Sequence, residues 1–317
     1  MRPRVAVVGV GHMGRFHVRK LRELARARAA ELVGLVDLDP ERAAEVAGKV
    51  GAPVLPDLAA VGHGADAAVV AVPTVAHYAV VRELLLAGLD VLVEKPLAAT
   101  SEEGEALLEL ARSRGRILQV GHLERFNSAV RALRDRIEAP RFVEAHRMGP
   151  FPERATDIDV VRDLMIHDLD LIQEILGEEP SEIEAIGVAV LTHEVDIANA
   201  RLRFPSGCIA NLTASRVSPS PMRKIRFFQP TGYFSLDLLA QSATILSRSR
   251  RPGGGRPEIA VSELDLCPED ALRLELESFL RSVRDRTEPA VSGEQALRAL
   301  RTALRVTEAM PPLGELP

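Results

Sequence analysis

The sequence of 317 residues contains only two cysteines, Cys208 and Cys267, and neither has a histidine or a second cysteine at metal-ligand spacing. We therefore expect neither a disulfide framework nor a structural zinc site. The chain also lacks an excess of charge of one sign, because its net charge is −5 with acidic and basic residues mixed. This balance gives no general surface for nucleic acid or for an anionic membrane.

Long hydrophobic runs are missing as well. The longest uncharged apolar run, residues 67–81, is interrupted by Pro73 and His77 and is too short to span a bilayer. The first expected strand starts by about Arg4, which leaves no room for a signal peptide before it. We therefore expect a cytoplasmic protein. Its length, with 27% charged and 46% hydrophobic residues, suits a soluble protein of two domains.

The most informative segment is an apolar run near the amino terminus that enters a Gly-x-Gly-x-x-Gly motif at positions 9–14. Gly9 permits a tight turn, Gly11 lets the backbone approach a pyrophosphate, and Gly14 lets the next helix lie close to the sheet. The first turn of that helix, with His12 and Met13, offers N–H groups to the phosphates. The motif predicts dinucleotide binding; the alternative is a glycine-rich turn between strand and helix.

A second apolar strand, residues 31–37, ends in Asp37. A carboxylate there can accept hydrogen bonds from the ribose hydroxyls of adenosine, and its charge repels the 2′-phosphate of NADP. Asp39 and Glu41 add further negative charge before the first base, Arg42. The sequence therefore favours NAD, and Arg42 leaves some room for NADP.

Strand and helix patterns alternate up to about residue 123. Apolar strands are expected at 5–10, 32–36, 67–72, 91–93 and 117–120, with helices such as 76–87 and 101–113 between them. Continuous apolar strands covered by helices indicate a doubly wound parallel sheet. We therefore assign residues 1–123 to a dinucleotide-binding Rossmann domain.

The pattern changes in residues 124–317. Helices are expected at 126–137, 163–176, 269–286 and 293–309, and strands at 142–147, 183–191, 197–204, 208–215, 224–228, 233–238 and 243–247. The glycine- and arginine-rich segment 248–257 is expected to be a mobile hairpin tip. Closely spaced strands indicate an open, mainly antiparallel sheet, so we predict an α+β domain for substrate binding and oligomerisation.

Lys95 follows an expected strand and lies between Glu94 and Pro96. Ligands of doubly wound folds bind beyond the carboxyl ends of the strands. Pro96 restricts Lys95 to an extended conformation, and the lysine amine can stabilise negative charge that develops on a substrate oxygen. The alternative is a solvated lysine at the entrance of a loop.

The helix expected at 163–176 carries a polar stripe. At 100° per residue, Asp163, His167 and Asp170 lie within about 60° of one another, and Met165 and Leu169 lie on the opposite face. A neighbouring carboxylate orients an imidazole and tunes its proton affinity, as a general base near neutral pH requires. The alternative is a solvated helix face with a surface histidine.

Two further segments contain polar residues that fit a site. Pro73, Thr74 and His77 follow an expected strand and fit a position beside the nicotinamide ribose, although Thr74 also fits a helix N-cap. Arg125 and Asn127 lie at the crossover between the domains. They line a cleft there, or they cap the helix that begins near Asn127.

Together these residues resemble the glucose–fructose oxidoreductase/inositol dehydrogenase (Gfo/Idh/MocA) family of nicotinamide-dependent dehydrogenases. The likeness covers nearly the whole chain, and its motifs occur in the family's order: the glycines at 9–14, Asp37, Glu94-Lys95-Pro96, and the helix with Asp163 and His167. The resemblance implies that Lys95, Asp163 and His167 line the active site. Met165 departs from the glycine that many members have there, and Ser128 departs from a common proline.

The segments 121–127 and 163–168 look closest to the branch that oxidises nucleotide sugars, such as UDP-N-acetylglucosamine at C3. The resemblance implies that His167 takes the hydroxyl proton, Lys95 binds the reacting oxygen and Asp163 positions substrate or imidazole, with no metal. The candidates to bind substrate are Arg125, Asn127, Arg147 and Arg154. Arg147 and Arg154 suit a diphosphate, and they also fit solvated loop arginines.

The resemblance also implies a homodimer or homotetramer that pairs sheet on sheet. Two alternatives to the nucleotide-sugar reading stay open. One is a dehydrogenase or other reductase of the same family that acts on a polyol or an unphosphorylated sugar. The other is a regulator that senses NAD and has lost catalysis.

Overall fold

The computed structural model describes residues 2–151, 158–249 and 258–312, and the chain forms two compact units. The first unit comprises Met1–Leu123 and Asp270–Leu297, and the second comprises Glu124–Glu269 and Arg298–Pro317. The expected division placed all residues after 123 in the second domain. The structure differs from it because the chain returns to the first unit for one helix, the loop after it and the start of the last helix.

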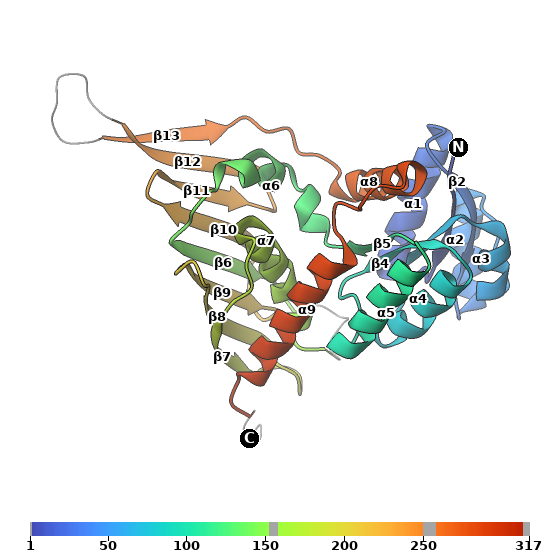
Figure 1. Cartoon of the computed structure of the whole chain (residues 1–317), viewed down its shortest axis with the longest axis horizontal. Helices are drawn as coiled ribbons and strands as arrows, with labels where there is room; N and C mark the ends of the chain where they lie inside the picture. Colours follow the sequence, from blue (N-terminus) through green and yellow to red (C-terminus); the bar gives the residue numbers. More distant parts are fainter. Residues whose placement is uncertain (1, 152–157, 250–257, 313–317) are drawn as a thin grey trace. The chain divides into compact units, whose positions relative to one another are not determined.

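The first unit is built on a five-stranded parallel sheet with the strand order β2-β1-β3-β4-β5. Figure 1 labels β2, β4 and β5 of this sheet. The strands are β1 (Arg4–Val8), β2 (Glu31–Val36), β3 (Ala67–Val70), β4 (Asp90–Glu94) and β5 (Leu118–Gly121). Strands β3, β4 and β5 are buried along their whole length. The order reverses between β1 and β3, and ligands of doubly wound sheets bind beyond the strand ends at such a reversal.

Helices of the first unit are α1 (His12–Arg26), α2 (Pro40–Val50), α3 (Leu58–Gly64), α4 (His77–Leu86), α5 (Ser101–Ser113) and α8 (Ala271–Asp285). Side chains of Asp39, Asp57 and Thr100 cap the amino ends of α2, α3 and α5. Each accepts a hydrogen bond from a backbone N–H that the helix leaves unpaired.

Helix α8 explains why the chain returns to the first unit. Its buried residues Leu276, Phe279 and Leu280 join one apolar cluster with Val18 and Leu21 of α1. Residues after α8 also bind the sheet edge, because the backbone N–H of Val120 donates to the carbonyl of Val291. An amphipathic helix shows its apolar stripe in the sequence but not the surface that the stripe covers.

The second unit contains an eight-stranded sheet in the order β13-β12-β11-β10-β6-β9-β8-β7. The strands are β6 (Phe142–Met148), β7 (Glu182–Val188), β8 (Ile197–Arg203), β9 (Ile209–Ser215), β10 (Met222–Gln229), β11 (Gly232–Asp237), β12 (Ser242–Ser249) and β13 (Glu258–Leu264). Strands β6 and β9 pair in parallel, and the other neighbouring strands just named are antiparallel. The expected α/β fold with a second, mainly antiparallel sheet is confirmed.

Strand β13 was not expected from the sequence. Within the described part of the chain it pairs with β12 alone, and its apolar residues Ile259 and Val261 are exposed. An edge strand of this kind lacks the buried alternating face that identifies other strands. Of the expected hairpin tip 248–257, residues 250–257 lie outside the described part of the chain.

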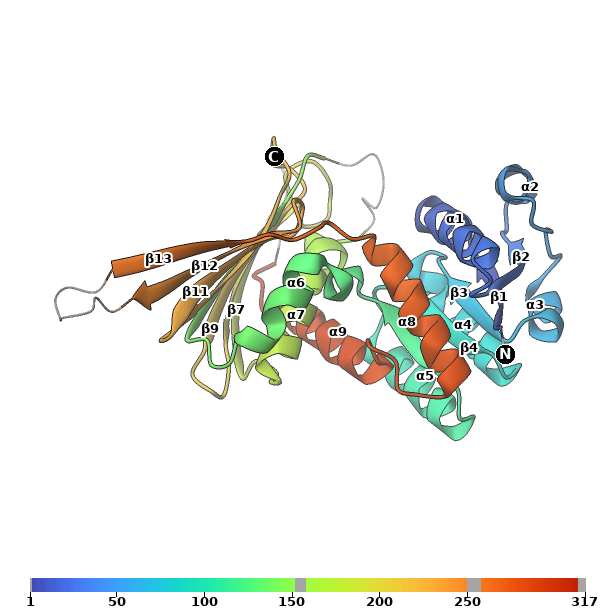
Figure 2. The same ribbon diagram turned by 90° about the horizontal axis from the view of Figure 1, so that it is seen from above.

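Helices cover one face of the second sheet (Figure 2). They are α6 (Ser128–Leu133), α7 (Ile166–Leu176) and the part of α9 (Gly293–Glu308) that starts at Arg298. Their apolar residues share one cluster with the inward side chains of the strands. Short 3-10 turns, Leu123–Phe126 and Arg134–Arg136, flank α6, so the single helix expected at 126–137 is shorter than predicted. No helix in the described ranges is long and apolar enough to cross a membrane.

Candidate active site

The glycine motif forms the turn between β1 and α1, and two of its glycines have a steric reason. Gly9 has a left-handed backbone with φ 84°, and a Cβ there would lie 2.7 Å from the carbonyl oxygen of Ala71. A Cβ on Gly14 would lie 1.9 Å from the carbonyl oxygen of Gly9. A Cβ on Gly11, in contrast, would meet no atom within 4 Å. Protein atoms therefore pack against the turn at Gly9 and Gly14, and the space beside Gly11 is open. A pyrophosphate could approach the backbone there and bind its N–H groups.

Helix α1 begins at this turn. Gly11 occupies the N-cap and offers no side chain to the first N–H groups of the helix, so these groups suit a phosphate. His12 is exposed and packs edge-on against Phe16 with the ring centroids 5.2 Å apart, and Met13 is half-buried. The motif therefore fits the phosphates of a dinucleotide.

Asp37 follows β2 and is held by three donors. Its carboxylate accepts hydrogen bonds from the backbone N–H groups of Val10 (2.7 Å) and Asp39 (2.9 Å). The guanidinium of Arg42 approaches it to 2.6 Å. Burial raises the pKa of Asp37, but these hydrogen bonds outweigh it, and the net pKa lies below its ordinary value. An ionised carboxylate thus lies beside the glycine turn, where the adenosine ribose would bind.

The loop after β3 contains Pro73, Thr74 and His77. Pro73 is the N-cap of the short 3-10 turn Thr74–Ala76, so Thr74 is not the capping residue. His77 is buried, with Nδ1 2.8 Å from the carbonyl of Pro96 and Nε2 3.0 Å from that of Val72. Burial lowers the pKa of His77, and the hydrogen bonds with the two carbonyls raise it. The net pKa lies below its ordinary value because the effect of burial is larger. His77 ties this loop to the one after β4.

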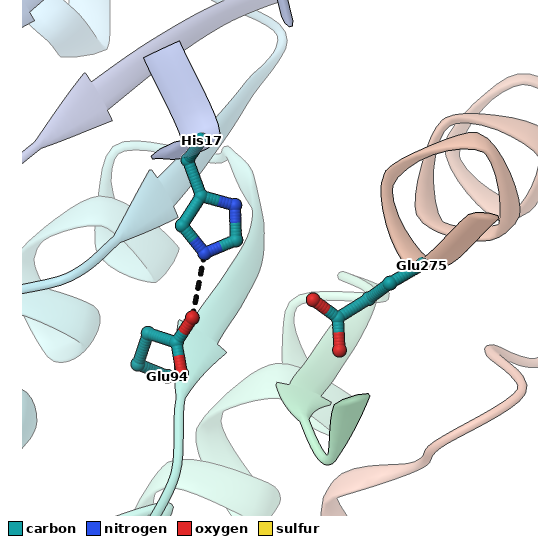
Figure 3. Close-up of side chains that lie close together, drawn as sticks. All are labelled: His17, Glu94 and Glu275. Atoms are coloured by element: carbon teal, nitrogen blue, oxygen red, sulfur yellow. Dashed lines mark hydrogen bonds and ion pairs between the residues drawn. The ribbon is translucent and has the colours of Figure 1, made fainter. Parts of the chain in front are cut away.

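Glu94 is the last residue of β4, Lys95 follows it, and the Lys95–Pro96 peptide bond is cis. The Oε1 atom of Glu94 lies 2.6 Å from Nε2 of His17 on α1 (Figure 3). Burial raises the pKa of Glu94, but the hydrogen bond with His17 and the charge of Lys95 outweigh it and lower the net pKa. Glu94 is therefore an ionised group that is hydrogen-bonded to α1. Lys95 is half-buried and lies just beyond the carboxyl end of β4.

In the second unit, Asp163 and His167 lie on consecutive helical segments. Asp163 belongs to the π-helical segment Val161–Met165, and His167 is the second residue of α7; both are half-buried. The 100° spacing expected from residue 163 onwards therefore holds only from Ile166. A π-helical turn re-aims the side chains around it, and such turns are frequent at functional sites.

The polar stripe expected on this helix is divided in the structure. Asp170 is 1% exposed and pairs with Arg125, whose two nitrogens lie 2.7 and 2.6 Å from its oxygens. Arg125 also lies 2.8 Å from Glu174. Asn127 caps α6, accepting from the N–H of Ala129, and is buried. These contacts give Arg125 and Asn127 structural partners inside the unit.

Arg147 lies between two carboxylates. Its guanidinium is 2.8 Å from Glu124 and 2.8 Å from Asp168, and its side chain is 3% exposed. Burial by itself lowers the pKa of Arg147, but the two carboxylates outweigh it and hold the pKa above its ordinary value. Because the guanidinium of Arg147 is buried and already paired with both carboxylates, it does not suit the binding of a substrate diphosphate. Arg154 lies outside the described residues.

Arg223 is a candidate that the sequence did not single out. It pairs in register with Arg147 across β10 and β6 and lies 3.7 Å from Glu124, with 47% of its side chain exposed. Burial and the neighbouring Arg147 lower its pKa, and Asp163 is among the carboxylates that raise it. Its partial exposure near Asp163 distinguishes it from Arg125 and Arg147. Strand pairing across 76 positions brings it there, and no local spacing reveals it.

The structure thus gathers two sets of expected residues. The glycine turn, Asp37 and the loops after β3 and β4 lie at the carboxyl ends of the first sheet, and Asp163 and His167 lie together in the second unit. Each set is placed within its own unit. That both sets serve one reaction is part of the proposal below.

Comparison with known proteins identifies both parts of the chain. Residues 3–122 match an oxidoreductase family with an NAD-binding Rossmann fold, and residues 129–234 match the GFO/IDH/MocA C-terminal domain. These matches show a Rossmann domain of the kind that binds NAD(P).

The whole chain is similar to individual dehydrogenases as well. UDP-N-acetylglucosamine 3-dehydrogenase of Acidithiobacillus ferrooxidans is 39% identical over 97% of both chains. A solved structure of that enzyme has a TM-score of 0.92 and 38% identity over 98% of both chains. The scyllo-inositol 2-dehydrogenase (NAD(+)) of Bacillus subtilis is 28% identical over 96% of this chain and 93% of its own.

Proposed function

The chain belongs to the Gfo/Idh/MocA oxidoreductase family, and on that premise we propose that it oxidises a secondary hydroxyl of a nucleotide sugar with NAD. UDP-N-acetylglucosamine, oxidised at C3, is the substrate that the relative from Acidithiobacillus ferrooxidans suggests. The observation that carries the proposal is that this likeness spans 97% of both chains. The family matches over residues 3–122 and 129–234 contain the glycine turn, Lys95 and His167.

The proposed chemistry divides the work between two side chains. His167 accepts the hydroxyl proton as general base, and Lys95 donates a hydrogen bond to the reacting oxygen. Asp163 orients the imidazole or the sugar. When bound, the nicotinamide supplies the hydride acceptor. No metal is needed in this scheme, because lysine and histidine provide the polarisation and the proton transfer.

The preference for NAD rests on Asp37. Its carboxylate is ionised and lies beside the glycine turn, and it would meet the 2′-phosphate of NADP with like charge. Arg42 already pairs with this carboxylate at 2.6 Å, which limits its reach to a phosphate. The expected cofactor contacts also include Pro73, Thr74 and Glu94, of which Pro73 is the most exposed.

A nucleotide sugar also carries a diphosphate. Because Arg125 and Arg147 are paired inside the unit, we assign the diphosphate contact to Arg223, whose guanidinium is half-exposed near Asp163. A sugar or polyol without phosphate would not need this cation. The inositol dehydrogenase among the relatives keeps that second substrate class open.

We also propose that the second unit pairs with a second copy. Side chains on the sheet face opposite the helices form one aromatic and aliphatic row across six strands: Ile209, Phe142, Phe228, Tyr233, Leu246 and Val261. The rings of Phe142 and Phe228, and those of Phe228 and Tyr233, lie 5.4 and 4.7 Å apart. Such a contiguous apolar surface is typical of an interface. A Phe228→Arg variant should sediment as a monomer.

A substrate panel tests the proposed reaction. NADH formation is followed with UDP-N-acetylglucosamine, other UDP-sugars, free sugars and inositols, each with NAD and with NADP. Turnover of UDP-sugars, and its loss in Arg223→Met, is the expected result. Turnover of inositol without UDP-sugars would reject the nucleotide-sugar assignment, and no turnover of any hydroxyl substrate would favour a non-catalytic regulator.

A further inference from the structure

Beside Lys95 lies a group of three titratable side chains, none of which takes part in the proposed proton transfer. They are His17 on α1, Glu94 on β4 and Glu275 on α8 (Figure 3). One nitrogen or oxygen atom of each lies within 4.8 Å of the other two. All three belong to the first unit, and we call them the His17–Glu94–Glu275 cluster.

Glu275 is the unusual member. It is 0% exposed, and neither carboxylate oxygen has a hydrogen-bond partner among the described residues. The side chain extends from α8 towards His17 and Glu94 (Figure 3). A buried ion without a partner is very unfavourable, so the group must carry a proton or receive a counter-charge. Burial raises the pKa of Glu275 well above its ordinary value, and the charge of Glu94 raises it further.

The groups around the cluster show where a charge can reside. Glu94 faces His17 from α1, and the charges of Lys95 and His77 also lower its pKa, so Glu94 is the ionised carboxylate. Glu275 faces His17, Glu94 and, from β5, Gln119, whose amide donates to the backbone carbonyl of Glu275 at 3.4 Å. Two neighbouring carboxylates in an apolar interior do not both ionise, because their charges repel.

We propose that Glu275 is a positioning residue: it stays protonated at neutral pH, directs its proton to Glu94, and thereby holds Glu94 and the adjoining Lys95 in place. This inference rests on the proposed function, because Lys95 is the residue that it serves. Glu94 has His17 on one side and Gly121 on another, where a Cβ would lie 3.1 Å from its Oε2. Glu275 approaches Glu94 from α8, with one oxygen atom of each within 4.8 Å of the other.

A divalent cation is the other occupant that one histidine and two glutamates suit. The 2.6 Å separation of His17 Nε2 and Glu94 Oε1 argues against it. Two ligand atoms of a tetrahedral zinc ion with bonds of 2.0–2.1 Å are about 3.4 Å apart. The existing pair would have to open, whereas a proton leaves it intact.

Three variants test the proposal: Glu275→Gln, which keeps the shape and a neutral donor, Glu275→Leu, which removes the donor, and Glu277→Gln. The last removes a carboxylate from the partly exposed side of the same helix and is the matched control. Infrared difference spectra at neutral pH need no substrate. Wild type minus Glu275→Gln should show the C=O band of a protonated carboxylic acid, and wild type minus Glu277→Gln should not. Absence of the first band would overturn the proposal.

The pH dependence of stability gives a second readout. A raised pKa in the folded state stabilises the protein below the unfolded pKa, about 4.3 for glutamate, and this stabilisation is lost as the pH rises towards the folded value. Wild type should therefore lose stability relative to Glu275→Gln as the pH increases above about 4.3. Parallel unfolding profiles would contradict a protonated Glu275.

Kinetics then test the link to Lys95. Glu275→Gln should keep the wild-type kcat, and Glu275→Leu should lose about tenfold or more in kcat, because a small misplacement of a catalytic group is costly. The loss of kcat in Glu275→Leu should exceed any rise in its dinucleotide KM, because Lys95 acts on the reacting oxygen. The proposal would be overturned by any of three results: full activity of Glu275→Leu, an equal loss of kcat in both variants, or stoichiometric zinc in the purified wild type. If wild type oxidises no hydroxyl substrate, the proposed function fails, and the infrared band still decides the state of Glu275.

Discussion

The two units present their candidate functional residues by different means. In the first unit, backbone does most of the work, since Gly9 and Gly14 exclude side chains and Gly11 opens the turn. In the second unit, buried ion pairs surround the helix of His167: Arg147 joins Glu124 to Asp168, and Arg125 binds Asp170. A backbone site is recognisable from local glycine spacing. An ion pair between residues 21 or 45 positions apart is not.

The largest effect is expected from the one histidine and the one lysine assigned to chemistry, which come from different units. His167→Asn and Lys95→Met should each lower kcat about a hundredfold or more, because each removes a general base or a donor to the reacting oxygen. Steady-state kinetics at saturating NAD measure this. The exposed residues His193 and Lys49 supply the controls His193→Asn and Lys49→Met. Full turnover in either site variant would remove that residue's assigned role.

A buried ion pair tests whether the second unit depends on charge as strongly as the comparison suggests. Arg147→Met removes the buried cation between Glu124 and Asp168 and leaves only the half-exposed Arg223, 3.7 Å from Glu124. We expect a cost of about 3–5 kcal/mol in the free energy of unfolding. Arg226→Met breaks the more exposed pair with Glu144 on the same sheet and should cost about 1 kcal/mol or less. Denaturant unfolding of both variants gives the values. Equal costs would mean that burial of the pair is not what matters.

Two glycine substitutions test whether the nucleotide site of the first unit depends on close backbone packing. Gly14→Ala places a Cβ 1.9 Å from a carbonyl oxygen, so α1 must shift, and we expect about 1–3 kcal/mol of destabilisation together with weaker NADH binding. Gly48→Ala adds a Cβ in open space inside α2 and should stabilise the protein by about 0.5–1 kcal/mol. Thermal unfolding and NADH fluorescence distinguish the two. If Gly14→Ala bound NADH with unchanged affinity, the assignment of this turn to dinucleotide binding would be wrong.

The smallest effect is expected at Asp37, the side chain in the first unit that we propose sets the preference between NAD and NADP. Asp37→Ser removes the repulsion of a 2′-phosphate and frees Arg42 to bind it, so the preference between NAD and NADP should shift about tenfold, or about 1.4 kcal/mol, towards NADP. Ratios of kcat/KM for the two cofactors measure the shift. Glu41→Gln, an exposed acid nearby, should leave the ratio unchanged. A shift of the same size in Glu41→Gln would indicate a general charge effect instead.

Prediction from the sequence was most complete where a pattern is local. The five parallel strands, the glycine turn and the place of Asp37 after β2 follow from apolar periodicity and turn chemistry. It failed where position depends on a distant partner. The exposed edge strand β13 has no buried face, and the π-helical turn at Asp163 breaks a periodicity that looks regular in the sequence.

The sequence by itself determined the glycine turn, most of the order of strands and helices, and the residue types available for chemistry, because these depend on neighbours within a few positions. Only the tertiary structure decided which charges those residues meet. It placed Arg147 between two buried carboxylates, brought Arg223 near Asp163, and returned α8 to the first unit so that Glu275 lies beside Glu94. Electrostatic partners are chosen by burial and distance in space, and no spacing along the chain encodes either one.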